Sequence, residues 1–198
     1  MHEDMKRFFA KTQQSATLPS SATVFQQMPL KPAVFHGRDA IIEEIAQLLI
    51  KKETSRVCIL GAGGMGKTSV ALGVVEQRLI KARFPPRNIV WVPCIEATSA
   101  ILLLEILSTQ LQLPGQVTIE NIISLLATST QPRLILLDNF ETPYNVLDGA
   151  QKQVEDILRR LAMLSHVAVL VTMRGRYPPC NEAIKWQSKD IQPTDERA

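Results

Sequence analysis

The stretch RVCILGAGGMGKTS, residues 56–69, decides the fold of this 198-residue chain. It opens with apolar residues typical of a buried strand and runs directly into Gly61-x4-Gly66-Lys67-Thr68, the pattern of a phosphate-binding loop (P-loop). Apolar residues then recur at helical spacing, at Val70, Ala71, Val74, Val75 and Leu79. A strand before the loop and a helix after it are the context in which this pattern binds nucleotides, so we expect a nucleoside triphosphate site here.

Each residue type in the loop has a physical reason. Glycines let consecutive backbone N–H groups turn inward around phosphate oxygens. Lys67 places a positive charge near the β and γ phosphates, and the hydroxyl of Thr68 reaches Mg2+. The glycines that supply this freedom are Gly61, Gly63, Gly64 and Gly66.

The amino-acid composition limits the fold class of the chain and the kinds of partner that it is expected to bind. Hydrophobic residues make up 45% of the chain, and the net charge is +3, with acidic and basic residues interspersed. This favours one globular domain and gives no reason to expect a nucleic-acid or membrane partner. The N-terminus lacks the apolar core of a signal peptide, and the longest apolar stretch, residues 100–107, is too short to span a bilayer. Three cysteines without metal spacing are expected to be free thiols, so we predict a cytoplasmic protein.

Strand and helix patterns alternate after an irregular beginning. Near-continuous apolar runs predict strands at 57–60, 89–93, 134–137 and 167–172, with a weaker fifth at 189–192. Helical spacing predicts helices at 39–52, with Asp39 as its cap, and at 67–81, 99–112, 119–127 and 151–164.

This alternation is typical of the α/β class. We expect a doubly wound parallel sheet of about five strands with helices on both faces, and a ligand at the carboxyl ends of the strands. Residues 1–34 are rich in Ser, Thr, Gln and Pro, which predicts a flexible arm. The nucleotide-binding domain is then residues 35–198.

A second motif, LILLD at residues 134–138, ends a predicted strand in a carboxylate. A P-loop ATPase needs such a residue to hold Mg2+ opposite the loop hydroxyl, so Asp138 and Thr68 are the expected metal ligands. Hydrolysis also needs a group that takes a proton from water. Asn139 cannot do this, and Glu141 is the nearest carboxylate. Two interpretations of Glu141 stay open, a catalytic base and a solvated acidic residue in a turn.

The strand predicted at 167–172 runs into Met173 and Arg174. A cation at the tip of a strand beside the loop can sense or stabilise the charge of the γ-phosphate, which would make Arg174 catalytic together with Lys67, Asp138 and Glu141. The alternative is a surface arginine in a loop, and Arg38 is the other candidate cation.

With these motifs in order, the chain resembles the nucleotide-binding domain of the STAND class of signalling ATPases, the NB-ARC and NACHT group. This group includes apoptosome proteins, plant resistance proteins and NLR-type receptors of innate immunity. The segments that carry the resemblance are VFHGRD (34–39), ILGAGGMGKTS (59–69), LILLDNFE (134–141) and VLVTMRG (169–175). Three further segments look like NLR-like proteins of filamentous fungi: WVPCIEATSA (91–100), LDNFETP (137–143) and QPTDERA (192–198).

The resemblance implies roles for individual residues. Val34 and Arg38 would lie near the adenine and ribose, and Gly61 to Ser69, with Met65 among them, would hold the phosphates. Asp138 would organise Mg2+, and Arg174 would report the nucleotide state. The implied ligands are ATP or ADP with Mg2+, and the implied protein partners are reached through neighbouring domains of a longer relative.

Two departures from the family pattern affect function. NB-ARC domains usually carry a second Asp where this chain has Asn139, and the family's helical and winged-helix lids would follow Ala198. Two hypotheses therefore stay open: an ATP/ADP switch that hydrolyses slowly, and a nucleotide-binding scaffold that never hydrolyses. An isolated chain of this kind is expected to be monomeric. A small-molecule kinase would need an arginine-rich lid and a GTPase an Asn-Lys-x-Asp motif, and the sequence favours neither.

Overall fold

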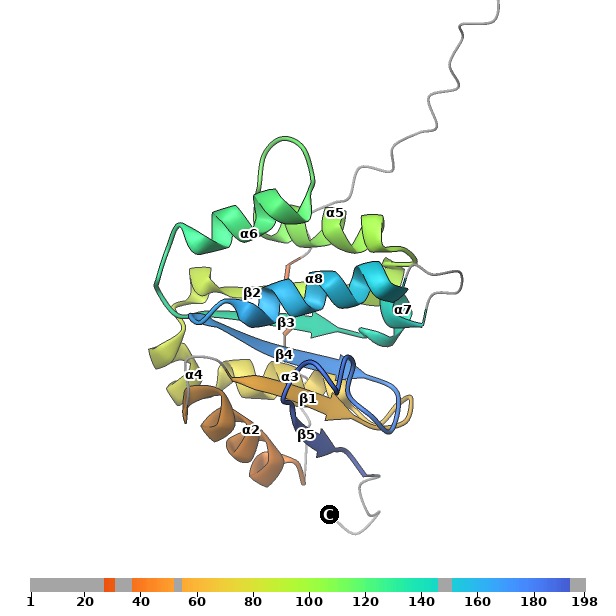
Figure 1. Cartoon of the computed structure of the whole chain (residues 1–198). Helices are drawn as coiled ribbons and strands as arrows, with labels where there is room; N and C mark the ends of the chain where they lie inside the picture. Colours follow the sequence, from red (N-terminus) through yellow and green to blue (C-terminus); the bar gives the residue numbers. More distant parts are fainter. Residues whose placement is uncertain (1–26, 31–36, 52–54, 146–150, 193–198) are drawn as a thin grey trace, which may run out of the picture.

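A computed structural model describes residues 27–30, 37–51, 55–145 and 151–192 of the chain. They form a five-stranded sheet with helices between the strands (Figure 1). In chain order the elements are α2 (Asp39–Lys51), β1 (Arg56–Leu60), α3 (Lys67–Glu76), α4 (Arg78–Arg83), η1 (Pro86–Asn88), β2 (Ile89–Pro93), η2 (Cys94–Glu96), α5 (Ala100–Gln110), α6 (Ile119–Ala127), β3 (Arg133–Asp138), α7 (Glu141–Tyr144), α8 (Gln151–Met163), β4 (Val167–Met173) and β5 (Gln187–Asp190).

All strands of the sheet are parallel, in the order β2-β3-β4-β1-β5. After β1 the chain crosses to the edge of the sheet at β2 and returns through β3 to β4, which lies beside β1. It then passes over β1 to place β5 at the other edge. The direction of winding thus changes around β1, and ligands of such sheets bind where the winding changes, at the carboxyl ends of the strands. The predicted fold class is confirmed.

Helices cover both faces of the sheet. One face packs against α2, α3 and α4, and the other packs against α5, α6 and α8. Figure 1 shows α8 in front of the sheet and α3 behind it. Alternate residues of each strand serve the two faces, so the strands are apolar almost throughout: β1 and β4 are buried along their whole length. In β1, for example, Cys58 and Leu60 face α8 while Val57 and Ile59 face α2 and α3.

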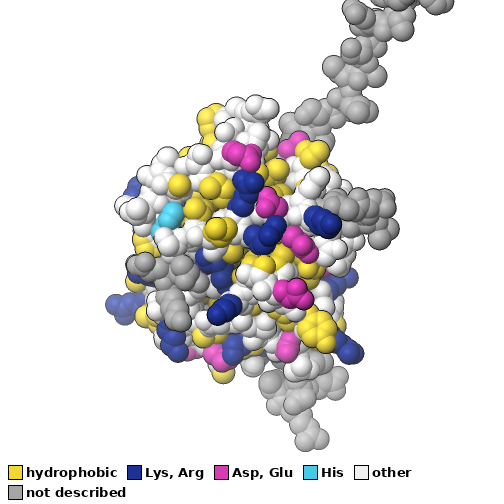
Figure 2. Space-filling view, viewed as in Figure 1, with side chains coloured by type: hydrophobic (Ala, Val, Ile, Leu, Met, Phe, Trp, Pro, Cys, Tyr) yellow, Lys and Arg dark blue, Asp and Glu magenta, His cyan; other side chains and the backbone are white. Residues whose placement is uncertain are grey.

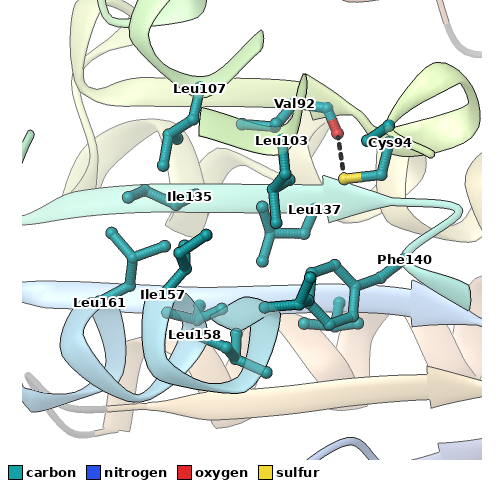
Figure 3. Packing of buried hydrophobic residues seen from close by; sticks show 14 of the residues in the cluster. Val92, Cys94, Leu103, Leu107, Ile135, Leu137, Phe140, Ile157, Leu158 and Leu161 are labelled. Atoms are coloured by element: carbon teal, nitrogen blue, oxygen red, sulfur yellow. Dashed lines mark hydrogen bonds between the residues drawn. The ribbon is translucent and has the colours of Figure 1, made fainter. Parts of the chain in front are cut away.

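The outer face of α8 is solvated, and its charges alternate in sign. Arg160 bridges Asp156 at 2.8 Å and Glu120 of α6 at 3.0 Å. Figure 2 shows blue and magenta side chains interspersed over this region. The inner face of α8 carries the apolar residues that the sequence pattern placed there. Figure 3 shows Ile157 and Leu161 beside Ile135 of β3, and Leu158 belongs to the same buried cluster.

Helix boundaries follow local capping. The hydroxyl of Ser99 accepts a hydrogen bond from Leu102 N at 3.1 Å, and that of Thr118 accepts one from Asn121 N at 3.2 Å. Both residues therefore cap their helices, so Ser99 precedes the helix that was predicted to include it, and Thr118 precedes the helix predicted at 119–127. Asp39 is the first residue of α2 rather than its cap.

One predicted helix is wrong in extent. The pattern at 67–81 predicts a single helix, but Gln77 is extended, with ψ 137°, and separates α3 from α4. The break lets α4 bury Ile80, while Phe84 at its end also enters the core. A continuous helix would carry α4 along the α3 axis, so tertiary packing here outweighs the helical propensity of the segment.

The fifth strand lies two residues earlier than its apolar pattern suggests, at Gln187–Asp190. It pairs with β1 alone, so half of its residues face solvent and the strand need not be apolar. The predicted arm, residues 1–34, lies outside the described residues except for 27–30, where Met28 packs against the face that holds α2 and α3. Within the described part of the chain, no helix is both long and apolar enough to cross a membrane.

Candidate functional site

The register of the sheet brings the predicted site residues together. Leu60 of β1 pairs with Met173 of β4, so Gly61 and Arg174 leave the sheet side by side. Leu137 of β3 pairs with Val171, which places Asp138 beside Thr172. Three strand ends thus meet at one edge, as expected for a parallel sheet.

The P-loop has the backbone that its glycines allow. Gly61 has φ 146°, and a Cβ there would lie 2.9 Å from the carbonyl oxygen of Ile191. Gly66 has φ 79° in the left-handed region and precedes α3 without any side-chain cap. The first turn of α3 carries no acidic residue. Its backbone N–H groups are therefore available to an anion at the amino end of the helix.

Lys67 is buried at the start of α3, and its ammonium points back into the loop. It donates to the carbonyl oxygens of Gly61 at 3.0 Å and Ala62 at 2.7 Å. An ammonium has three N–H groups, so beyond these two bonds within the described chain it can serve an anionic ligand. Burial lowers the pKa of Lys67; the Glu141 carboxylate opposes this shift, Arg174 adds to it, and Asp138 opposes it more weakly.

Thr68, Asp138 and Thr172 form a connected polar cluster. The hydroxyls of Thr68 and Thr172 both donate to Oδ1 of Asp138, at 2.8 and 2.5 Å. Burial raises the pKa of Asp138, and the two hydroxyl hydrogen bonds partly offset that effect. The carboxylate is thus held in place directly beside the loop hydroxyl, so the two groups are close enough to hold one Mg2+ between them and the phosphates.

Asn139 makes the turn after β3. Its φ is 57°, and its backbone N–H donates to the Thr172 hydroxyl at 3.0 Å. Asn tolerates this left-handed conformation better than other non-glycine residues. The next residue, Phe140, is fully buried, and its N–H donates to the carbonyl of Thr172 at 2.9 Å. The backbone N–H groups of both Asn139 and Phe140 therefore bind Thr172 and hold the turn after Asp138 against β4.

Glu141 is paired with Arg174. Its Oε1 lies 3.1 Å from the guanidinium Nε, and its Oε2 accepts from the Arg174 backbone N–H at 3.1 Å. The Glu141 side chain is 13% exposed and that of Arg174 is 65% exposed. A Cβ on Gly63 would lie 3.4 Å from the Arg174 guanidinium carbon. Arg174 therefore spans from Glu141 to the P-loop, and Glu141 is not a free turn residue.

A cavity of about 700 Å3 lies on the other side of the loop. Its walls are the loop, the end of β5 and the segment after β4, through Gly61, Ala62, Met65, Gly175, Arg176, Tyr177, Asp190, Ile191 and Gln192. Arg38 donates from its guanidinium to the carbonyl oxygen of Gln192, which brings it to the rim of this cavity.

The structure thus gathers most of the predicted site. Lys67, Thr68, Asp138, Glu141 and Arg174 meet around the loop, and Ser69 lies in the first turn of α3. Gly64 has φ 78° with open space where a Cβ would be, and Met65 lines the cavity. Val34 lies outside the described residues. Sequence reasoning missed Thr172, for which the polar residue inside the apolar run VAVLVTM was a signal.

The residues fit a magnesium nucleotide. Among the described residues, no group of three or more His, Cys, Asp or Glu side chains is arranged to hold a metal. Mg2+ is commonly bound through one or two carboxylates with substrate phosphates, which suits a site of one carboxylate and one hydroxyl. The uncapped helix end and the Lys67 ammonium suit the phosphates.

Comparison with known proteins gives a family and a fold. A family model described as Novel STAND NTPase 1 matches residues 24–190. Among curated proteins no significant match was found.

Several solved structures share the fold of this chain at low sequence identity. The Aeropyrum pernix ORC2 protein, solved as ADPNP–ADP complexes, has TM-score 0.64 and 16% identity over 84% of this chain and 50% of its own. Cdc6p from Pyrobaculum aerophilum has TM-score 0.62 and 13% identity, over 84% and 48%. The Walker-type ATPase PABY2304 of Pyrococcus abyssi has TM-score 0.54 and 11% identity, over 87% and 58%. The chain spans about half the length of these structures, and the likeness concerns the fold alone.

Proposed function

Because this chain belongs to the Novel STAND NTPase 1 family, and is therefore an NTPase domain of the STAND type, we propose that it binds ATP and ADP with Mg2+ and acts as a nucleotide-dependent switch. The observation that carries the proposal is the 2.8 Å hydrogen bond from the Thr68 hydroxyl to Asp138 Oδ1. It joins the P-loop to the carboxylate of β3, two motifs that are 70 residues apart in the sequence.

In the proposed complex, each group of the site has one task. Backbone N–H groups between Gly61 and Ser69 hold the phosphates, and Lys67 neutralises their charge. Thr68 and Asp138 would hold Mg2+, which would supply positive charge to offset that of the phosphates. Thr172 keeps the Asp138 carboxylate in position through its 2.5 Å hydrogen bond.

Slow hydrolysis is part of the proposal. Glu141 is the carboxylate that can accept a proton from water, but both of its oxygens are engaged by Arg174. Asn139 serves the turn and cannot accept a proton. Movement of the Arg174 side chain toward the γ-phosphate, which the charge of that phosphate favours, would free Oε1 of Glu141 for the attacking water.

A non-hydrolysing scaffold is the second candidate, favoured by the same pairing of Glu141 with Arg174. A single-turnover assay with protein in excess over labelled ATP separates the two. The switch hypothesis predicts slow conversion of ATP to ADP. Conversion no faster than in buffer alone would contradict the switch and support the scaffold.

The proposed signalling role rests on the resemblance of the sequence motifs to those of NB-ARC and NACHT proteins, including NLR-like proteins of filamentous fungi. In such a protein, neighbouring domains read the nucleotide state and supply the protein partners. The free cysteines Cys58, Cys94 and Cys180 fit a reducing compartment, so we place the protein in the cytoplasm.

Native mass spectrometry tests the proposed binding. Protein purified without added nucleotide, and protein supplied with ATP and Mg2+, should each be weighed and its nucleotide identified after denaturation. Bound ATP or ADP is the expected result. A folded protein that carries no nucleotide and takes none up with Mg2+ would contradict the proposal.

A further inference from the structure

The cavity beside the P-loop has a composition that differs from that of the phosphate site. None of its lining residues belongs to β3, the strand that carries Asp138. Ile191 and Met65 contribute apolar surface, and Tyr177 contributes an aromatic side chain that is 74% exposed. Its volume, about 700 Å3, falls within the usual range of small-molecule pockets.

The position of this cavity assigns it to the nucleoside end of a bound nucleotide. The phosphates are expected at Lys67 and the amino end of α3, so the sugar and base must extend from there. Asp190 at the cavity wall would repel phosphate but can accept a hydrogen bond from a ribose hydroxyl, the role of acidic residues near strand ends in dinucleotide-binding sheets. The nearby Arg176 is exposed.

Tyr177 is held on an anchored segment. The Trp186 indole donates to the carbonyl of Pro179 at 2.6 Å, and the N–H of Cys180 donates to the Tyr144 hydroxyl at 3.2 Å. Pro179 and Cys180, which accept and donate in these two contacts, follow Tyr177 closely in the sequence, so the backbone beside Tyr177 is held in place. An aromatic ring that is exposed yet carried by an anchored segment costs little entropy to order against a ligand.

We propose that Tyr177 is the stacking platform for the nucleobase, with Asp190 beside the ribose. This inference rests on the proposed function, because it extends the same ligand from the P-loop into the cavity. Every base presents a π-face, so stacking on Tyr177 distinguishes nucleotides from inorganic polyphosphates more than it distinguishes one base from another.

Calorimetric titration of ATP, ADP and inorganic tripolyphosphate, each with Mg2+, tests the assignment. Tyr177→Ala should weaken ATP and ADP binding roughly tenfold, in the range of base–aromatic stacking, and leave tripolyphosphate binding unchanged. Tyr177→Phe keeps the ring and should restore the affinity for ATP. Met163→Ala is the matched control, since Met163 is an apolar side chain that is 82% exposed, lies at the end of α8 and lines a different cavity.

The outcomes separate the inference from its premise. Equal ATP affinity in Tyr177→Ala and the unmodified protein would overturn the stacking role while leaving nucleotide binding intact. An equal loss for ATP and tripolyphosphate would also overturn it, because Tyr177 would then support the loop rather than the base. Failure of the unmodified protein to bind either ligand would overturn both the inference and the proposed function.

Discussion

At the scale of single residues, Lys67 has the clearest consequence. Its ammonium is buried and bonded to the loop carbonyls of Gly61 and Ala62. Lys67→Ala should therefore reduce ATP affinity at least about a hundredfold, because the phosphates lose a charge-assisted partner in a desolvated site. The fold should survive, since the core faces of α3 are unchanged. Calorimetry and thermal melting measure the two effects together.

A matched control for Lys67 is Lys81→Ala. Lys81 is exposed and pairs with Glu76 at the surface, where an ion pair contributes little to stability. Its replacement should leave ATP affinity unchanged. Unchanged ATP affinity in a folded Lys67→Ala protein would remove the assignment of the P-loop.

Asp138 illustrates a conflict between stability and function. Burial raises its pKa, so the ionised carboxylate is costly in the folded protein. Asp138→Asn keeps an oxygen for the two threonine hydroxyls but removes the charge. At neutral pH we expect it to raise the free energy of unfolding by up to about 1 kcal/mol, and to abolish the Mg2+ dependence of nucleotide binding. Denaturant unfolding measures the change in the free energy of unfolding, and nucleotide titrations with and without Mg2+ measure the metal dependence of binding.

The pH dependence of the Asp138→Asn effect has a definite sign. When the pKa of an acid is higher in the folded than in the unfolded state, its cost to folding is complete above the folded pKa and vanishes below the unfolded one. The stability advantage of Asn over Asp should therefore shrink as the pH falls toward 3.8, the ordinary pKa of Asp. An advantage that grows on acidification would show that the Asp138 carboxylate is stabilising instead.

Glu141 and Arg174 yield a prediction about turnover. Glu141→Gln should lower the slow hydrolysis rate by about a hundredfold or more, because Gln cannot accept the proton of water. Its effect on ATP affinity should stay within a few-fold. Rates under single-turnover conditions and affinities by calorimetry decide this. If Glu141→Gln leaves the rate intact and Asn139→Ala eliminates it, the roles of the two residues are reversed.

Residues of the loop were predictable because the chemistry of phosphate fixes their types and spacing. The pairing of Glu141 with Arg174 was not, since the two lie 33 positions apart and meet only through the register of β3, β4 and β1. Thr172 was missed for the same reason. Its hydroxyl matters because Asp138 lies on the neighbouring strand, which no sequence pattern states.

At the scale of helices and strands, Arg56 of β1 connects its own strand with α8 and β4. Its guanidinium donates to the carbonyls of Ala162 and Leu164 around the end of α8, and to Val167 of β4 at 2.6 Å. The bond to Ala162 satisfies a carbonyl that the last turn of α8 leaves without a partner within the helix. Burial lowers the pKa of Arg56 to about 10, so the side chain stays charged at neutral pH.

Arg56→Met should therefore destabilise the domain by about 2–4 kcal/mol, since buried carbonyls lose a charged donor. The control Arg159→Met removes only an exposed pair with Asp156 at 3.5 Å and should cost less than about 0.5 kcal/mol. Urea unfolding of both variants compares them. Equal stability of Arg56→Met and the unmodified protein would show that water replaces the guanidinium.

The helices and strands were mostly evident from periodicity, and their errors have local causes. The break at Gln77 escaped prediction because α3 and α4 together keep a continuous apolar pattern, and the packing of Ile80 and Phe84 decides the bend. The short helix α7 was missed because Pro143 and its neighbours resemble a turn. Edge strand β5 was misplaced by two residues because it is only half-buried.

At the scale of the whole molecule, the sequence predicted a parallel doubly wound sheet but not its strand order. Alternation of strands and helices fixes the class, while the order β2-β3-β4-β1-β5 depends on which strands meet across the core. That order is what places β4, with Thr172 and Arg174, between the P-loop strand and the strand of Asp138.

The surface of the described part of the chain predicts the oligomeric state. Its exposed large apolar side chains lie on separate elements: Leu30, Leu79, Ile95, Ile101, Met163 and Tyr177. Charges of both signs are interspersed over the face drawn in Figure 2. Stable self-association needs an extended complementary apolar patch, so we expect this chain to be monomeric with either nucleotide.

Light scattering with ADP and with a non-hydrolysable ATP analogue, each with Mg2+, tests this expectation. A mass of one chain in both states is the expected result. Nucleotide can shift a population only if two states differ in their contacts with it, and the Glu141–Arg174 pair is the element here whose contacts the γ-phosphate would change. A ring or filament that forms only with the ATP analogue would mean that this local change already controls an assembly surface within the 198 residues. Glu141→Gln, which releases Arg174, should then assemble at lower concentrations of the analogue.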